Sequence, residues 1–364
     1  MGKKKLLSGY RVLDLSQYIP GPFAARSLAD LGADVIKIEP PAGDPMRSFM
    51  YTSQAGEVSP VYRHLNRGKT VAVLNLKEKQ DKQHLARLLR GADVLLESYR
   101  PGVMARLGFD RDRLQALNPR LVHCALSGFG QSGPFRDRAG HDLTYCAVAG
   151  ALSASGTGER PVMTYPPVAD HAGAMQAVNT ILAALLSRER NGKGLFLDIS
   201  LTDSILSWQY IGLAESQDKN ESPRERLLLN GGAACYNIYA TSDGRFVALA
   251  ALETKFWKTF CQQTDHPDWI ARHQEKMPQK ELIAELQALF SSRPLSEWQE
   301  LLAEADCCFE PIPDISESAI HPQFEARASI VGRQPGYPGW INGKPVEVKA
   351  DYLELPAGQA PLWR

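Results

Sequence analysis

The sequence has no excess charge of either sign and no long apolar run, and each absence excludes a class of protein. Its 364 residues include 41 Lys plus Arg and 41 Asp plus Glu, so the formal net charge is zero. The basic charge of a nucleic-acid-binding protein is therefore missing. No segment approaches the ~18 consecutive apolar residues of a membrane helix, and the start MGKKKLLSGYRV lacks the apolar core of a signal peptide. We expect neither nucleic acid nor membrane among the partners.

Several chemical signatures are also missing. The six cysteines form no C-x-x-C pair and have no disulfide-like spacing, which favours a reduced, cytoplasmic location. There is no H-E-x-x-H motif and no cluster of cysteine and histidine, so we expect no metal site. The absence of a G-x-S-x-G motif weakens a serine hydrolase interpretation.

What is present is a regular alternation of strand and helix patterns. Residues 10–15 (YRVLDL) predict a strand, the PGP turn at 20–22 opens a helix, and residues 34–39 (DVIKIE) predict a second strand. Such a βαβ unit indicates a parallel sheet, and this one lacks the dinucleotide fingerprint G-x-G-x-x-G. The pattern continues with predicted strands at 70–75, 93–97, 121–125 and 195–199, and predicted helices at 81–90, 170–188 and from Thr202 onward. The sequence therefore predicts an α/β domain.

The character of the sequence changes after Tyr210. The polar stretch ESQDKNESPRER predicts a linker or exposed loop. A hairpin is predicted at 237–250 around the turn SDG, and helices follow at 254–263, 280–290 and 295–303. We therefore predict a large Rossmann-like domain over 1–210, a linker over 211–228 and a smaller α+β domain over 229–322.

Two side chains stand out as candidates for chemistry. GHDLTY (140–145) places His141 beside an aspartate, and Asp170 follows in PPVADHAGA at the predicted start of a helix. Asp170 there can cap the helix or act as a base or nucleophile, and a lone histidine such as His141 is usually structural. The loop SGFGQSGP (127–134), directly after a predicted strand, suits backbone contact with a ligand or a plain turn. These residues alone leave the function open.

Long, ordered blocks identify the chain as a member of the family III CoA-transferase superfamily, the group of carnitine and formyl-CoA transferases and α-methylacyl-CoA racemases. The blocks are GYRVLDLSQYIPGPFAARSLADLGADVIKIEPPAGDPMR, NRGKTVAVLNLK, ADVLLESYRPGVMARLGF and NPRLVHCALSGFGQSGP. AGHDLTY resembles the racemase loop A-G-H-D-x-N-Y, whose histidine transfers protons. NGGAACYNIYATSDGRFVALAALETKFW and EADCCFEPI resemble two further racemase blocks.

The resemblance implies roles for individual residues. His141 and Asp170 would be the two proton-transfer groups of a 2-methylacyl-CoA racemase or epimerase, with Glu253 orienting or tuning His141. In the transferases a single aspartate, here Asp170, forms an acyl anhydride and passes CoA to a carboxylic acid. Lys77 and Arg106 match basic residues that contact CoA, although Pro40 stands where many members carry another CoA-contacting arginine. Gly140, Asp142 and Tyr145 of the histidine loop complete the expected CoA-binding residues.

The resemblance also implies the assembly and the ligand. The family fold joins a large Rossmann-like domain to a small α+β domain, residues 323–364 would return to the large domain, and two chains interlock as a homodimer. The expected ligand is an acyl-CoA substrate, with no cofactor beyond its coenzyme A, and the racemase branch points to lipid metabolism. We favour the racemase over the transferase because His141 and Glu253 occur together. A non-catalytic acyl-CoA binder is the third alternative, and it would require the loss of a catalytic position.

Overall fold

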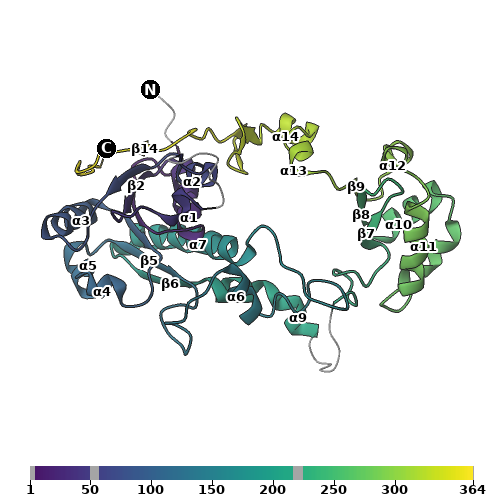
Figure 1. Cartoon of the computed structure of the whole chain (residues 1–364), viewed down its shortest axis with the longest axis horizontal. Helices are drawn as coiled ribbons and strands as arrows, with labels where there is room; N and C mark the ends of the chain where they lie inside the picture. Colours follow the sequence, from purple (N-terminus) through teal and green to yellow (C-terminus); the bar gives the residue numbers. More distant parts are fainter. Residues whose placement is uncertain (1–4, 50–56, 216–223, 364) are drawn as a thin grey trace. The chain divides into compact units, whose positions relative to one another are not determined.

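The computed structural model describes residues 5–49, 57–215 and 224–363, which form two compact units (Figure 1). The first unit contains Met1–Ala149, Tyr165–Tyr210 and Pro322–Arg364, and the second contains Gly150–Thr164 and Ile211–His321. Residues 150–164, which the sequence-based division assigned to the large domain, thus group with the second unit. The predicted fold class is confirmed: one unit is α/β with a parallel sheet, and the other is a smaller α+β unit.

A parallel sheet of seven strands forms the core of the first unit, in the order β14-β3-β2-β1-β4-β5-β6. Leucine, valine and isoleucine dominate its central strands, which are buried on both faces as parallel strands between helical layers must be. The sequence predicts six of the strands to within two or three residues. The strands are β1 (Arg11–Leu15), β2 (Asp34–Glu39), β3 (Thr70–Val73), β4 (Val94–Glu97), β5 (Val122–Ser127), β6 (Phe196–Ser200) and β14 (Leu353–Glu354).

Helices cover both faces of this sheet. On one face, Leu13 and Ile36 pack into an apolar core with α3 and α5. On the other face α1 packs against α7, and here the alternate residues Asp14 and Lys37 are buried. The helices of the unit are α1 (Pro20–Asp30), η1 (Pro45–Arg47), α2 (Pro60–Asn66), α3 (Lys79–Gly91), α4 (Val103–Arg106), α5 (Arg111–Leu117), α6 (Asp142–Val148), α7 (Val168–Asn191), α8 (Leu201–Leu206), η2 (Ser207–Gln209) and α14 (Pro322–Ala326).

The second unit is built on a small antiparallel sheet with the order β7-β8-β9. The predicted hairpin forms, with Tyr239 opposite Val247, and β9 adds an edge that the sequence did not predict. Trp257, Phe260 and Phe290 lie in its aromatic core. The elements are α9 (Tyr210–Glu215, shared with the end of the first unit), β7 (Tyr236–Ala240), β8 (Phe246–Ala250), α10 (Thr254–Gln263), η3 (Pro267–Gln274), α11 (Lys280–Phe290), α12 (Leu295–Leu302), β9 (Phe309–Pro311) and α13 (Ile315–Ser318).

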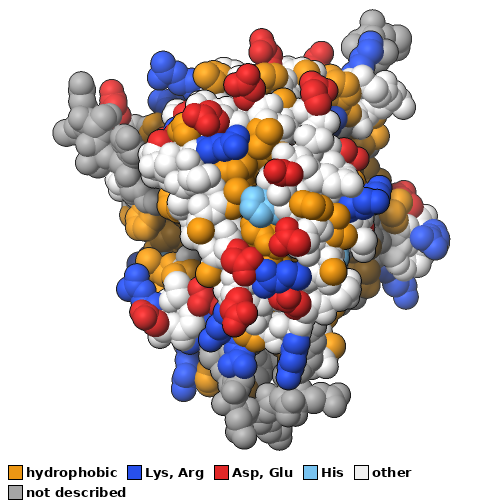
Figure 2. All heavy atoms as spheres, turned by 90° about the vertical axis from the view of Figure 1, so that its right-hand side faces the viewer, with side chains coloured by type: hydrophobic (Ala, Val, Ile, Leu, Met, Phe, Trp, Pro, Cys, Tyr) orange, Lys and Arg blue, Asp and Glu red, His pale blue; other side chains and the backbone are white. Residues whose placement is uncertain are grey.

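The surface of the second unit mixes charges of both signs. Figure 2 shows acidic and basic side chains interspersed with apolar ones on the face that carries α10, α11 and α12. Among the described residues seen there, no broad patch of one sign forms. This agrees with the zero formal net charge of the chain.

The structure corrects two local predictions. Asp170 is not the N-cap of its helix, because α7 begins at Val168, after Pro166 and Pro167, and Asp170 lies in its first turn. The predicted linker 211–228 is helical over its first residues, which belong to α9, since apolar residues continue there from η2. Residues 216–223 of that prediction lie outside the described part of the chain.

The C-terminal segment returns to the sheet of the first unit. Its strand β14 pairs in parallel with β3, with Leu353 opposite Thr70. Two short antiparallel hairpins precede it, β10 (Ile330–Val331) with β11 (Gln334–Pro335) and β12 (Trp340–Ile341) with β13 (Lys344–Pro345). Trp363 then donates from its indole nitrogen to the carbonyl of Leu88 at 3.0 Å.

Candidate active site

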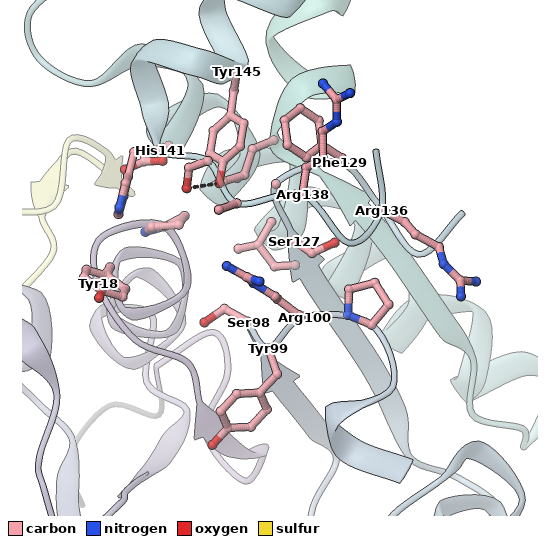
Figure 3. Close-up of a pocket in the computed structure, with 18 of the residues that line it drawn as sticks. Tyr18, Ser98, Tyr99, Arg100, Ser127, Phe129, Arg136, Arg138, His141 and Tyr145 are labelled. Atoms are coloured by element: carbon pink, nitrogen blue, oxygen red, sulfur yellow. Dashed lines mark hydrogen bonds between the residues drawn. The ribbon is translucent and has the colours of Figure 1, made fainter. Parts of the chain in front are cut away.

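A cavity of about 290 Å³ lies at the carboxyl edge of the parallel sheet, where α/β folds bind their ligands (Figure 3). The turns after three neighbouring strands and the starts of two helices supply its walls. Its polar and charged lining consists of Gln17 and Tyr18 after β1, Ser98, Tyr99 and Arg100 after β4, Ser127 at the end of β5, Arg136 and Arg138 after β5, His141 and Tyr145 at α6, and Asp170 at α7. The two candidate groups from the sequence, His141 and Asp170, thus line the same cavity.

Glycine is required at two points of this wall because the ring of Tyr145 packs directly against the backbone. A Cβ atom added at Gly128 or at Gly140 would lie 2.5 Å from a carbon of that ring. The Tyr145 hydroxyl donates to the carbonyl of Gly140 at 2.6 Å. The glycine-rich loop and the GHDLTY segment are therefore held together by one buried tyrosine.

His141 precedes the first turn of α6 and leaves its ring exposed at the cavity. Its backbone N–H donates to Thr144 Oγ1 at 3.0 Å, which satisfies one of the free amides at the helix start. The imidazole meets the ring of Tyr18 edge to face, with ring centroids 5.8 Å apart. Tyr18 itself has a φ of 63°, a left-handed conformation that is uncommon for a residue other than glycine.

Asp142 joins the two helices that carry the candidate groups. Its Oδ1 atom accepts hydrogen bonds from the backbone N–H of Ala169 at 2.7 Å and of Asp170 at 3.0 Å. These are free amides at the start of α7, so Asp142 performs the capping role that the sequence allowed for Asp170. Fixing α6 to α7 in this way places His141 and Asp170 on one cavity.

Asp170 is half-buried, and its pKa is raised. Burial raises its pKa from 3.8, and the negative charge of Asp142 raises it further, to about 7. Burial, and next the charge of Asp170, raises the pKa of the Tyr145 hydroxyl to about 12. A carboxyl group with a pKa near 7 can both accept and release a proton at neutral pH.

Three arginines line the cavity, and reasoning from the sequence missed all of them. In Figure 3 the guanidinium group of Arg100 lies near the centre of the drawn residues, whereas Arg136 points away from them. Arg136 pairs with Asp137 at 3.1 Å, and the guanidinium carbon of Arg138 lies 3.8 Å from the ring centroid of Phe135. A signal was available: Arg100 lies three residues after the end of the predicted strand 93–97, at the edge where ligands bind.

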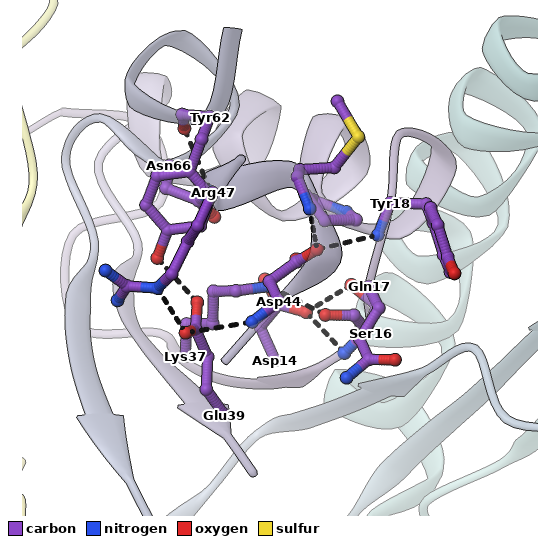
Figure 4. A network of polar contacts seen from close by, with 12 residues as sticks. Asp14, Ser16, Gln17, Tyr18, Lys37, Glu39, Asp44, Arg47, Tyr62 and Asn66 are labelled. Carbon is purple, nitrogen blue, oxygen red and sulfur yellow. Dashed lines mark hydrogen bonds and ion pairs between the residues drawn. The ribbon is translucent and has the colours of Figure 1, made fainter. Parts of the chain in front are cut away.

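The turn that carries Gln17 and Tyr18 is held by hydrogen bonds to buried charged side chains (Figure 4). Lys37 donates to Asp44 Oδ2 at 2.9 Å and to the carbonyl of Ser16 at 2.7 Å, and Asp44 Oδ1 accepts from the N–H of Tyr18 at 3.3 Å. Beside them Lys69 donates to Asp14 Oδ2 at 2.8 Å. Burial lowers the pKa of Lys69 to about 8, although the charge of Asp14 opposes this.

The remaining predicted site residues lie elsewhere. Lys77 is exposed in the turn between β3 and α3, and Arg106 is exposed in α4; neither lines the cavity. Glu253 is exposed in the second unit, directly before α10. Within the described ranges there is no group of three or more His, Cys, Asp or Glu side chains that could hold a metal ion. No helix in these ranges is long and apolar enough to cross a membrane.

Comparison with known proteins agrees with this arrangement. Residues 7–361 match the model of CoA-transferase family III. The chain belongs to that family. It is 33% identical over 356 residues to the acetyl-CoA:oxalate CoA-transferase of Acetobacter aceti, which covers 92% of this chain and 89% of the relative. It is 34% identical over 330 residues to the human alpha-methylacyl-CoA racemase, covering 89% and 82%.

Solved structures give the same result. A CAIB/BAIF family protein from Brucella suis is similar with a TM-score of 0.82 and 26% identity, covering 98% of this chain and 97% of the other. Like its relatives, this family III chain is therefore an acyl-CoA enzyme of the CoA-transferase and racemase superfamily. The predicted family is confirmed. The homodimer, the cytoplasmic location and the role in lipid metabolism stay predictions.

Proposed function

We propose that this protein is a racemase or epimerase that inverts the 2-methyl centre of a CoA thioester by proton transfer between two bases. The observation that supports this best is the acidity of Asp170 in a cavity that His141 also lines. A group that must remove a proton in one direction and return it in the other works best with a pKa near the operating pH.

In this mechanism the thioester makes the hydrogen on its α-carbon acidic. Ionised Asp170 removes that hydrogen from one face, and the protonated imidazole of His141 delivers a hydrogen to the opposite face. In the reverse direction the two groups exchange roles. The enolate that forms between the two steps needs hydrogen-bond donors at its oxygen, and backbone amides of the glycine-rich loop are the expected source. Glu253 remains a prediction as the group that tunes His141.

The CoA moiety would extend along the sheet edge from this cavity. Lys77 follows β3, and Arg106 follows β4 in α4, so both basic residues come after strands that end at this edge. With β2 and β1 between them, β3 and β4 lie roughly 14 Å apart at about 4.8 Å per strand. That separation suits a long ligand whose phosphates contact Lys77 and Arg106 while its thioester reaches Asp170.

A CoA-transferase is the second candidate, supported by the arginines of the cavity. The Asp170 carboxylate would attack the thioester carbonyl, form a mixed anhydride and release CoA as its thiolate. An acceptor carboxylate would then attack the aspartyl carbonyl of the anhydride and displace the donor acid, and the bound CoA thiolate would attack the acceptor carbonyl of the new anhydride, which forms the acceptor's CoA thioester and releases the Asp170 carboxylate. Arginine is well suited to hold such an acceptor carboxylate. However, a pKa of about 7 leaves much of Asp170 protonated at neutral pH, and a protonated carboxyl is a poor nucleophile. This favours the racemase.

Proton NMR in deuterated water with a 2-methylacyl-CoA separates the two functions. For a racemase the α-hydrogen exchanges without any acceptor acid, and Asp170→Asn and His141→Ala each abolish net inversion because it needs two bases. Each variant can retain exchange of one enantiomer through the surviving group. His84→Ala serves as a control, since His84 lies on α3 away from the cavity lining.

The transferase predicts a different pattern. Only Asp170→Asn would be inactive, because a carboxamide cannot form the anhydride, and His141→Ala would keep most CoA transfer to an added carboxylic acid. A His141→Ala enzyme that inverts its substrate at nearly the parental rate would refute the racemase proposal.

A further inference from the structure

Arg100 is an exposed arginine that lines the same small cavity as the proposed proton-transfer groups. Its guanidinium group lies near the centre of the drawn residues, between Ser98 and Ser127 (Figure 3). Among the described residues no carboxylate forms an ion pair with Arg100. The nearby Tyr145 hydroxyl is sensitive to its charge, because Arg100 opposes the rise in the pKa of that group. An anion from the substrate would therefore meet a charge that is not already neutralised.

The two serines beside Arg100 can add hydrogen bonds to such an anion. Ser98 Oγ accepts from the N–H of Gln17 at 3.0 Å, which leaves its own hydrogen free to donate. Ser127 is buried, and its Oγ accepts from Gln131 Nε2 at 3.4 Å, so its hydrogen is available too. One guanidinium and two hydroxyl donors around one space are a suitable set for the two oxygens of a carboxylate.

The size of the cavity indicates which part of the substrate carries this anion. The phosphates of CoA are separated from the thioester by the whole pantetheine arm. A cavity of about 290 Å³ that contains both Asp170 and Arg100 is too small to hold the reacting carbon, that arm and the phosphates together. When the reacting carbon lies beside Asp170, an anion bound to Arg100 therefore comes from the acyl group and not from the CoA phosphates.

We infer that Arg100 binds a second carboxylate on the acyl group, so that the substrate class is the CoA monothioester of a 2-methyl dicarboxylic acid. This inference rests on the proposed function for the position of the α-carbon. It goes further by fixing the charge of the acyl chain: the end remote from the thioester is anionic and not an aliphatic tail.

A pair of nearly isosteric substrates tests this. In 2-methylglutaryl-CoA, with the thioester next to the methylated carbon, a carboxylate stands where 2-methylpentanoyl-CoA has a methyl group. We expect kcat/KM for exchange of the α-hydrogen to be roughly ten- to a hundredfold higher for the glutaryl compound, the range of a hydrogen-bonded charge. Arg100→Gln should bring this ratio close to one, and Arg100→Lys should restore part of it.

Arg113→Gln is the matched control, because it removes the same charge from an exposed side chain of α5 that does not line this cavity. It should leave the substrate ratio unchanged. If Arg100→Gln instead weakens both thioesters and free CoA equally, Arg100 binds the CoA phosphates and the inference is wrong. A parent enzyme that prefers the pentanoyl compound also overturns it.

Failure of the proposed function gives a separate result. If neither thioester exchanges its α-hydrogen, the racemase proposal fails, and the dissociation constants of the same two thioesters still test Arg100. Tighter binding of the glutaryl compound that is lost in Arg100→Gln supports the anion site, whereas equal binding in the parent protein refutes it.

Discussion

Replacing Asp170 by asparagine should stabilise the protein above neutral pH while it removes activity. Burial, and next the charge of Asp142, raises the pKa of Asp170 from 3.8 to about 7. The two pKa values differ by about 3, and one pKa unit corresponds to about 1.36 kcal/mol. Ionising Asp170 therefore costs the folded state on the order of 4 kcal/mol. Solvent on its exposed side lowers this cost, and a carboxylate in the first turn of α7 gains about 0.5 kcal/mol from the helix dipole. A net gain of about 2 kcal/mol remains for Asp170→Asn.

The pH dependence of this gain has a definite sign. Because the pKa of Asp170 is higher in the folded state than in the unfolded state, the folded state binds the proton more tightly. The resulting stability is present in the parent protein below about pH 4 and is lost as the pH rises to about 7. An asparagine has no such dependence. The variant should therefore match the parent near pH 4 and exceed it most above pH 7.

Calorimetry or chemical denaturation at pH 5 and pH 8 measures this difference, with the transition of the first unit followed separately from that of the second. Asp112→Asn is a suitable control, since it neutralises an exposed carboxylate in the first turn of α5. Compared with the parent, the Asp112→Asn control should not become comparably more stable as the pH rises. An Asp170→Asn protein that is equally stabilised at both pH values, or less stable than the parent at pH 8, would show that Asp170 is not held in its protonated form by the fold.

Two further predictions concern binding and the buried charges. Lys77→Ala or Arg106→Ala should raise KM for the acyl-CoA about tenfold or more and change kcat less. The reason is that charge-assisted contacts to phosphate are worth about 1.5–3 kcal/mol. Unchanged KM values in steady-state assays would mean that CoA binds elsewhere. Asp14→Asn should lower the free energy of unfolding by about 3–5 kcal/mol, since it leaves Lys69 and Lys37 buried with less compensating charge. A denaturation midpoint equal to that of the parent would contradict this prediction.

The first unit could be predicted well because its signals are local. Buried strands such as 34–39 and 93–97 are short apolar runs bounded by turn residues, and each lies within two or three residues of its predicted position. The strand β14 was missed because it is two residues long and pairs with β3 across most of the chain. Nothing in its own sequence distinguishes it from the surrounding loop.

The site was predicted only in part because the pKa of Asp170 is raised by burial and by a residue distant from it in the chain. Sequence patterns and family resemblance indicated His141 and Asp170, but the sequence also allowed Asp170 the capping role that Asp142 performs from 28 positions earlier in the chain. That pairing depends on how α6 meets α7, which no periodicity encodes. Arg100 was overlooked for a different reason: an arginine after a strand is common on surfaces, and only the cavity shows which way it points.

The buried charges beneath Tyr18 explain how the protein can hold a strained residue beside a proposed base. A left-handed tyrosine costs about 1–2 kcal/mol, and the turn would relax if nothing opposed it. Buried ion pairs such as Lys37 with Asp44 rarely stabilise a fold more than apolar residues of the same volume would. They do supply hydrogen-bond partners at fixed points, and here those partners are the carbonyl of Ser16 and the N–H of Tyr18. An apolar core would hold neither, so the orientation of Tyr18 toward His141 depends on charges that the sheet keeps away from solvent.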